Sequence, residues 1–182
     1  MITILVPEQE YYDSGTNKFY TVKARSLQLE HSLISISKWE AKWKKPFFGK
    51  DRMTNEQFLD YISCMSLTPN VDPEIYKFLG RDNYNKIADY INDPMTATWF
   101  SDDDSKNKRP RRETVTSELV YYWMIALNIP MECQKWHFNR LMTLIKVCNI
   151  KNTPAKKMKK SEIMSRNRAL NEARRKALNT SG

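Results

Sequence analysis

Apolar residues are most concentrated in residues 116–149, and this stretch dominates the hydrophobic pattern of the chain. Residues 119–127 form an unbroken apolar and aromatic run, which predicts a central helix buried on all sides. After the turn sequence 128–130, apolar residues return every three to four positions, which predicts a second, amphipathic helix. The apolar positions of this second helix are Phe138, Leu141, Ile145 and Cys148. The stretch therefore predicts a buried helical hairpin around which the domain is built.

The start of the chain has the β-branched and aromatic composition of strands. Residues 2–6 and 18–23 are of this type, and a strong turn sequence lies between them at residues 13–17. These features predict a β-hairpin at about residues 2–23. Residues 26–30 alternate as well and form a candidate third strand. Because so small a sheet is not stable alone, we expect it to lie against the helices.

Between these strands and residue 92, the apolar period lengthens to three or four residues, which predicts short helices. Thr54 followed by Gln57 has the form of a capping box. Asp72-Pro73 has the form of an N-cap followed by a first-turn proline, and Asp82 is the expected N-cap of the last helix. The predicted helices span about residues 31–45, 54–66, 72–79 and 83–92.

The net charge of +9 is concentrated at the end of the sequence, because residues 151–182 hold ten lysines and arginines against two acidic residues. This tail is rich in helix formers but has a thin apolar stripe, so we expect a helix that is loosely attached or forms on binding. Residues 101–113 contain no apolar residue and predict an exposed charged loop. The predicted fold is therefore mainly α (α+β): one helical domain over residues 1–150 with a small N-terminal β-hairpin, followed by a basic helical tail at 151–182.

The three cysteines are Cys64, Cys133 and Cys148, and they form no C-x-x-C motif. Each lies among apolar residues at helical spacing, which predicts buried, reduced thiols in a reducing cytoplasm. The longest apolar run, residues 119–127, is far shorter than the ~20 residues of a membrane-spanning helix. The first residues lack the pattern of a signal peptide. We therefore expect a cytoplasmic protein with no membrane segment.

Two groups of residues are candidate metal ligands. Cys133 and His137 are four positions apart, a spacing that places two ligands on one face of a helix. A zinc site needs three or four protein ligands, and the only other histidine is His31. Asp102-Asp103-Asp104 offers oxygen ligands but lacks the pattern of a calcium loop. We interpret the first pair as core packing and the second group as a solvated acidic loop, so we predict no metal.

Catalytic motifs are missing from the sequence. It contains no G-x-S-x-G, no G-x-G-x-x-G and no phosphate-binding P-loop, and it has only four glycines. A Cys–His pair is conceivable only within the most apolar stretch, where burial makes a thiol inert. We therefore predict a protein that is not an enzyme and has no cofactor.

The densest aromatic cluster outside residues 116–149 consists of Trp39, Trp43, Phe47 and Phe48, and lysines alternate with it. Aromatic anchors beside cations are typical of the hot spots of protein interfaces. The hypothesis is that these four residues bind an apolar helix of a partner. The alternative is that both tryptophans belong to the core and the lysines form a solvated face.

The basic residues of the tail form a second candidate binding region. They are Lys156, Lys157, Lys159, Lys160, Arg166, Arg168, Arg174 and Arg175. Such residues bind phosphates with salt-sensitive, sequence-independent affinity. However, residues 151–182 contain no aromatic residue on which a base would stack. A nucleic acid and an acidic protein surface both stay open as partners of the tail.

Four segments resemble open reading frames of tailed bacteriophages. They are LEHSLISISKWEAKWKKPF (29–47), DYISCMSLTPNVDP (60–73), NDPMTATWF (92–100) and SELVYYWMIALNIPMECQKWHFNRLMTLIKVCNIKN (117–152). On these segments the chain resembles tail assembly chaperones of long-tailed phages (siphoviruses), although a β-hairpin at the start departs from that family.

The resemblance implies a small helical protein of the host cytoplasm, absent from the mature particle. It would bind the tape measure protein and recruit tail-tube subunits, and no catalytic residue is carried over. The predicted function is therefore that of a non-enzymatic tail assembly chaperone in virion morphogenesis. The alternative is a basic nucleic-acid-binding phage protein whose tail contacts phosphates.

Overall fold

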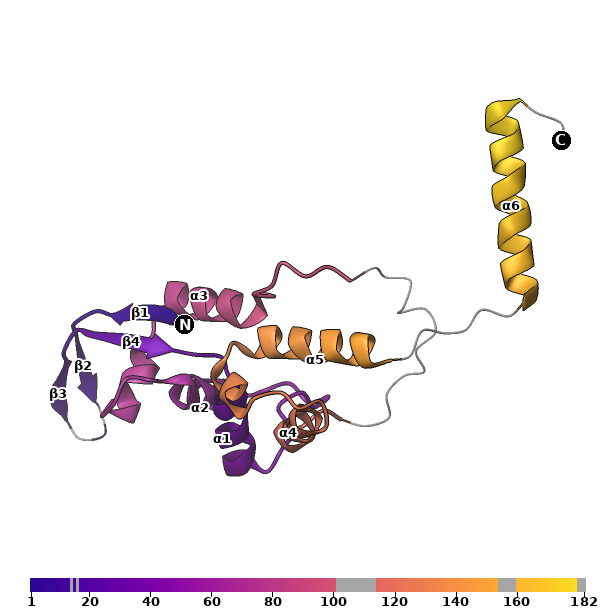
Figure 1. The fold of residues 1–182 in the computed structure, drawn as a ribbon. Coiled ribbons are helices and arrows are strands. Elements are labelled where there is room, and N and C mark those ends of the chain that lie inside the picture. The colour runs from indigo at the N-terminus through magenta and orange to yellow at the C-terminus, as the bar shows by residue number, and fades with distance from the viewer. Residues whose placement is uncertain (14, 16, 101–113, 154–159, 180–182) are drawn as a thin grey trace. The chain divides into compact units, whose positions relative to one another are not determined.

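The computed structural model describes residues 1–13, 15, 17–100, 114–153 and 160–179. These residues are mainly helical, with small antiparallel sheets near the N-terminus, which confirms the predicted α+β, mainly α class (Figure 1). The chain divides into two units, Met1–Asn149 and Ile150–Gly182. The loop predicted at 101–113 lies outside the described residues.

The strands form two antiparallel pairs. They are β1 (Ile2–Val6), β2 (Gln9–Asp13), β3 (Lys18–Val22) and β4 (Arg25–Leu29), with β1 paired to β4 and β2 paired to β3. The turn between residues 13 and 18 is where the sequence placed it, but the predicted partner of residues 2–6 was wrong. These residues pair with the candidate third strand, and the hairpin extends to Leu29. Pro7, which has no N–H to donate, stands at the break between the two ladders.

One face of the β1–β4 pair belongs to the hydrophobic core. Ile4, Val6, Leu27 and Leu29 are buried, whereas the residues between them on both strands are exposed. This strict alternation is expected of a sheet that packs on helices with one face only. The outer edge of β4 is extended by the chain that follows α2, where Leu67 N–H donates to the carbonyl of Gln28 at 2.8 Å.

The helices of the first hundred residues begin largely where their caps predict. They are α1 (Leu33–Trp43), α2 (Asn55–Met65), the 3₁₀ helix η1 (Pro73–Phe78) and α3 (Arg81–Asn92). Thr54 and Gln57 make both hydrogen bonds of the predicted capping box, and Asp72 caps η1. The helix predicted at 83–92 is confirmed as α3, but its predicted cap was wrong, because the N-cap is Gly80 and Asp82 lies in the first turn. There the carboxylate of Asp82 still meets the positive end of the helix dipole.

The two helices predicted on either side of residues 128–130 are α4 (Ser117–Ala126) and α5 (Phe138–Asn152), with the 3₁₀ helix η3 (Met131–Lys135) between them. Phe138, Leu141 and Ile145 are buried in α5, which confirms its amphipathic pattern. The all-round burial predicted for α4 was wrong, since its face at Tyr122 and Ile125 is exposed. The reason is position: α4 lies at the margin of the core and packs against α1 on one side.

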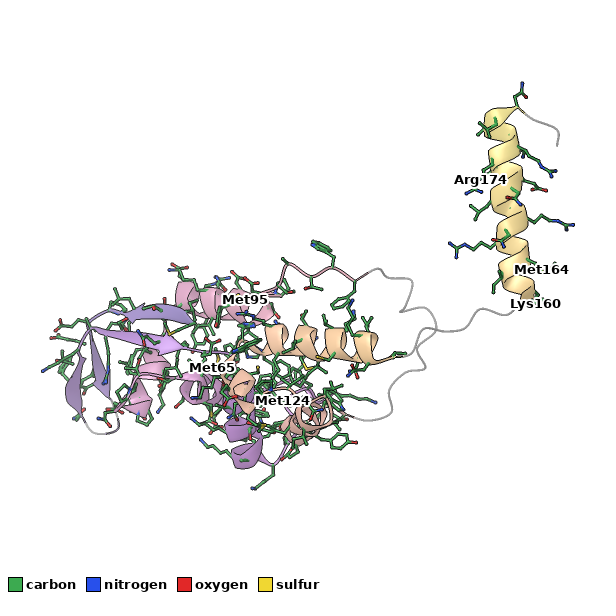
Figure 2. The ribbon with its side chains drawn as sticks, in the orientation of Figure 1. Met65, Met95, Met124, Lys160, Met164 and Arg174 are labelled. Carbon is green, nitrogen blue, oxygen red and sulfur yellow. The ribbon has the colours of Figure 1, made fainter. Side chains whose placement is uncertain are left out.

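In the second unit, α6 (Lys160–Leu178) is a single helix, as the helix-forming composition of the tail predicted. Its described side chains are all exposed, the apolar ones included. Lys160, Met164 and Arg174 are labelled on this helix in Figure 2, and Met65 and Met124 on α2 and α4 belong to the core of the first unit.

Candidate interaction surfaces

The predicted aromatic cluster begins on the buried side of α1. Trp39 is only 2% exposed, and its indole N–H donates to the backbone carbonyl of Gln57 at 2.9 Å. Trp43 is half-buried, and its indole N–H donates to the carboxylate of Asp60 at 2.8 Å. The expectation that Trp39 is a surface anchor is wrong, because it lies three residues after Ile36 on the face that enters the core.

Phe47 and Phe48 follow α1 and lie between helices. Phe47 is half-buried, with its ring 4.4 Å from that of Tyr61. Phe48 is 42% exposed and stacks on Phe138 with 5.0 Å between ring centroids. Of the four predicted contact residues, Phe48 is therefore the most exposed. The cluster as a whole mainly forms the packing interface between α1, α2 and α5.

The buried carboxylate of Glu40 links this packing interface to α4. One oxygen accepts a hydrogen bond from the backbone N–H of Phe47 at 2.8 Å, and the other accepts from the N–H of Ser117 at 2.7 Å. Ser117 is the first residue of α4, where the helix dipole favours a negative charge. Each hydrogen bond to a charged group contributes about 1.5–3 kcal/mol. Sequence pattern gave no sign of this role, because Ser117 lies 77 residues after Glu40 in the chain.

The exposed side of α4 carries two large apolar side chains. Tyr122 is 64% exposed and Ile125 is 66% exposed. They are three residues apart and share one helix face, which we call the α4 face (Tyr122, Ile125 and the exposed Ala126). Val120 and Met124, on the opposite side, are fully buried. The α4 face is therefore held in place by a well-packed back while its own apolar groups contact solvent.

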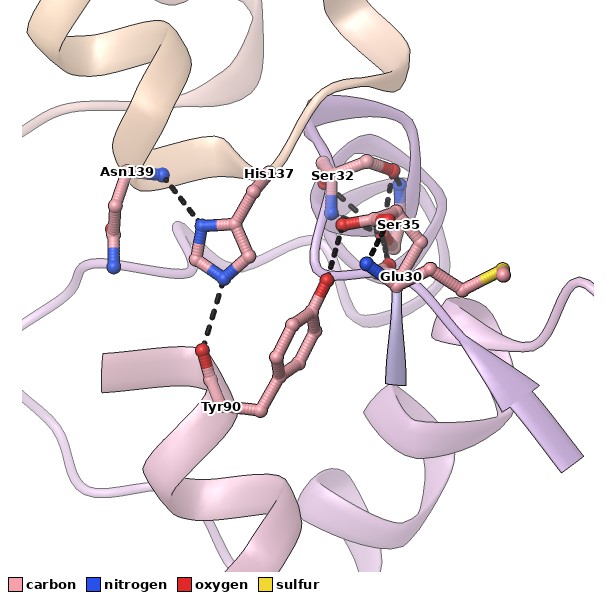
Figure 3. A network of polar contacts seen from close by, with 7 residues as sticks. Glu30, Ser32, Ser35, Tyr90, His137 and Asn139 are labelled. Atoms are coloured by element: carbon pink, nitrogen blue, oxygen red, sulfur yellow. Dashed lines mark hydrogen bonds and ion pairs between the residues drawn. The ribbon is translucent and has the colours of Figure 1, made fainter. Parts of the chain in front are cut away.

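A network of polar groups lies inside the first unit, where α3, α5 and the start of α1 meet (Figure 3). His137 Nε2–H donates to the backbone carbonyl of Tyr90 at 2.9 Å, and His137 Nδ1 accepts from the N–H of Asn139. Because a carbonyl only accepts, these two bonds fix the neutral Nε2–H tautomer. His137 thus provides an N-terminal cap for α5, and the Tyr90 hydroxyl donates to Glu30 at 2.6 Å.

His31 lies beside His137, with 5.1 Å between the ring centroids, and its Nδ1 is hydrogen-bonded to the hydroxyl of Tyr61. Burial, reinforced by the charge of His137, lowers the pKa of His31 to about 3. Burial also lowers the pKa of His137, against the opposing effects of the Tyr90 carbonyl and Glu30. Both imidazoles are therefore neutral at pH 7, and each is hydrogen-bonded to a neighbouring group of the protein.

The thiols of Cys64 and Cys133 are poor nucleophiles, and the candidate metal ligands Cys133 and His137 are not assembled. Burial and the charge of Asp60 raise the pKa of Cys64 to about 11, and burial raises that of Cys133 as well. Cys133 lies in η3 whereas His137 precedes α5, so the two are not four apart on one α-helix. Among the described residues, no group of three or more His, Cys, Asp or Glu side chains is placed to hold a metal. Residues 102–104 lie outside that set.

The basic tail residues are only partly described. Lys156, Lys157 and Lys159 lie outside the described residues. Lys160, Arg166, Arg168, Arg174 and Arg175 are on α6, and all five are exposed. Successive residues of a helix are 100° apart, so Arg166 and Arg174 lie on one side of α6 and Arg168 and Arg175 on another. The helix is therefore cationic around much of its circumference.

Comparisons with known proteins add no assignment to these surfaces. None of the helices in the described part of the chain has the length and apolar character needed to cross a bilayer. No protein-family model, curated protein or solved structure matches this chain.

Proposed function

We propose that this chain is a non-enzymatic binding protein that holds an apolar segment of a partner protein on the α4 face. The observation that carries the proposal is the pair Tyr122 and Ile125, exposed over about two thirds of their surface on a helix whose other side is fully packed. Fully burying one such side chain contributes about 1.5–3 kcal/mol. A partner that covers the exposed two thirds of both side chains gains about 2–4 kcal/mol from this pair, and further contacts around the α4 face must supply the rest of the binding free energy.

The partner that we propose follows from the resemblance to tail assembly chaperones. In that setting, the α4 face binds an apolar helix of the tape measure protein, and tail-tube subunits join the complex. The neutral buried histidines and the protonated thiol of Cys64 support a role in binding over one in catalysis. The rigid back of α4 supports a preformed site, which loses little conformational entropy on binding.

The test is a titration of the purified full chain with the tape measure protein encoded by the same genome. We expect saturable binding that weakens at least tenfold in the double variant Tyr122→Lys, Ile125→Lys. The matched control is Phe19→Lys, which places a lysine at an exposed apolar position on β3 and should bind normally. Circular dichroism shows that each variant is folded. Equal binding by the double variant and the wild type, or no binding by either, would contradict the proposal.

A second candidate function uses α6, because its exposed arginines favour an anionic partner. We propose nucleic-acid binding through phosphates as this alternative. Full-length protein with Arg166, Arg168, Arg174 and Arg175 changed to Gln should lose its affinity for DNA, and wild-type affinity should fall linearly with salt on logarithmic axes. Wild-type protein that binds neither single- nor double-stranded DNA or RNA at low salt would remove this alternative.

A further inference from the structure

Strand β1 has one edge that pairs with no other strand in the described part of the chain. On its other side it pairs with β4. Helix α3 runs beside β1 (Figure 1), and the space between the open edge and the first turns of α3 is a pocket of about 560 Å³. Residues of β1 form one wall, and residues 80–83 with Lys86 form the other.

The hydrogen bonds of β4 determine which backbone groups β1 presents at this edge. Gln28 directs both its N–H and its carbonyl away from β1, to Thr68 Oγ1 at 2.9 Å and to Leu67 N–H at 2.8 Å. Thr3 is the residue opposite Gln28, so this pair exchanges no hydrogen bonds and Thr3 also directs its backbone groups outward. The backbone N–H and carbonyl of Leu5, two residues later, are directed to the same edge.

The contact of Leu5 with α3 is independent support for this direction. The side-chain amide of Asn83 donates to the carbonyl of Leu5 at 3.0 Å, across the open edge. Asn83 therefore satisfies one backbone group of the edge. By the register, the N–H and carbonyl of Thr3 and the N–H of Leu5 are directed to the same edge, and both residues line the pocket. A row of this kind is a template for another extended chain.

We propose that the open edge of β1 binds an extended, acidic segment of another protein, which adds as a strand in the groove beside α3. Addition of a strand to a sheet edge uses main-chain hydrogen bonds for affinity and neighbouring side chains for selection. The acidic character follows from the wall of the pocket, where Arg81 and Lys86 outnumber the single acid, Asp82. Leu5, 64% exposed, gives the added strand an apolar neighbour on its outward face.

This site is separate from the α4 face and does not rest on it. Its partner is selected by extended backbone and negative charge, whereas the α4 face selects an apolar surface. Loss of the α4 face in the Lys double variant should therefore leave strand addition intact, which makes the failure of one proposal distinguishable from the failure of the other.

The probe is a synthetic eight-residue peptide of alternating valine and glutamate, blocked at both ends and titrated into isotopically labelled full chain. We expect saturable shifts of the amide resonances of Thr3 and Leu5, and slower hydrogen exchange at both. A peptide of the same length with lysine for glutamate should bind at least tenfold more weakly. Shifts confined to other parts of the chain, no binding at millimolar peptide, or equal affinity for both peptides would overturn the proposal.

The variant Thr3→Pro removes one outward N–H and leaves every hydrogen bond of the β1–β4 ladder. We expect it to bind the valine–glutamate peptide at least tenfold more weakly, whereas Thr3→Val, which keeps the N–H, should bind normally. A second measurement covers the case in which Thr3→Pro fails to fold: the same peptide, N-methylated at alternate residues, is titrated into wild-type protein. Normal affinity of both methylation registers, or of a folded Thr3→Pro, would overturn strand addition.

Discussion

Most proteins bury apolar side chains and expose polar ones. The polar network around His137 departs from this rule by burying polar groups, and the α4 face departs from it by exposing apolar groups. The network places two histidines, two tyrosines and a carboxylate inside the first unit, whereas the α4 face places a tyrosine and an isoleucine in solvent. In the network, the described buried polar side chains all have hydrogen-bond partners. The α4 face has no apolar neighbour over most of its surface. One region is complete within the chain, and the other is completed by a partner under our proposal.

The comparison shows why residue type alone did not locate the exposed α4 face. A buried polar group is costly unless it is hydrogen-bonded, so the fold itself has to provide a partner for each polar group of the network. An exposed apolar group costs little in a monomer, so nothing in folding removes it. The exposed apolar groups of the α4 face are therefore better candidates for partner binding than the paired polar groups inside the core.

The largest expected effect is a difference in stability between variants on the two sides of α4. Met124→Ala should lower the free energy of unfolding by about 2–5 kcal/mol, because it opens a cavity in the core. Ile125→Ala, on the next residue, should change it by less than about 0.5 kcal/mol, since it removes only solvated surface. Urea unfolding of both variants measures the difference. Similar losses at both positions would mean that something covers the α4 face in the isolated chain.

The attachment of α4 to α1 depends on Glu40, and the next prediction tests it. Glu40→Gln keeps the shape of the side chain but turns one acceptor into an amide that faces an N–H donor. We expect a loss of about 2 kcal/mol in the free energy of unfolding. The control is Glu132→Gln, an exposed carboxylate on η3, with an expected change of less than about 0.5 kcal/mol. Equal effects would contradict the anchoring role.

Glu40 also marks the limit of what sequence pattern could predict. Local signals were sufficient for α1, α2 and α5, because their apolar spacing and caps lie within one segment of chain. The capping box at Thr54 and Gln57 is an example. Glu40 bonds to Ser117, 77 residues later, and no local pattern encodes such a contact. The same holds for β1, which pairs with β4 and not with the nearer β3.

The exposure of Trp39 was mispredicted for a related reason. Trp39 and Tyr122 are both aromatic residues in helical segments, and their type does not say which side of each helix meets the core. For α1, the polar residues between the apolar ones indicate the solvent side, and Trp39 follows the buried stripe. For α4, an unbroken apolar run removes that indicator, so the exposed face could be found only from the packed structure.

The polar network should make the first unit sensitive to acid. His31 and His137 have pKa values below the unfolded value of about 6.5, so the unfolded chain binds more protons. Stability is therefore fully present above pH ~6.5 and falls as the pH drops toward the folded pKa values, by up to ~1.4 kcal/mol per pH unit for each histidine. Urea unfolding between pH 7 and pH 5 measures the slope.

The matched variant for this titration is His137→Asn. Asparagine offers a side-chain oxygen to the N–H of Asn139, so it can still cap α5, but it does not titrate. The slope below pH 6.5 should shrink in this variant and retain the contribution of His31. A wild-type stability that is flat from pH 7 to pH 5 would contradict the assignment of two buried neutral imidazoles.

The smallest effect concerns Cys64, where burial protects a reactive group without any change in stability. With its pKa raised to about 11, less than ~1% of this thiol is ionised at pH 8, and the thiolate is the nucleophile. Alkylation of Cys64 by iodoacetamide should therefore be at least tenfold slower than that of a free cysteine peptide, and should recover in urea. Mass spectrometry of tryptic peptides measures each rate. A native rate equal to that of the free peptide would contradict the raised pKa of this half-buried thiol, and the contrast between the protected side chains of α2 and the exposed α4 face would be lost.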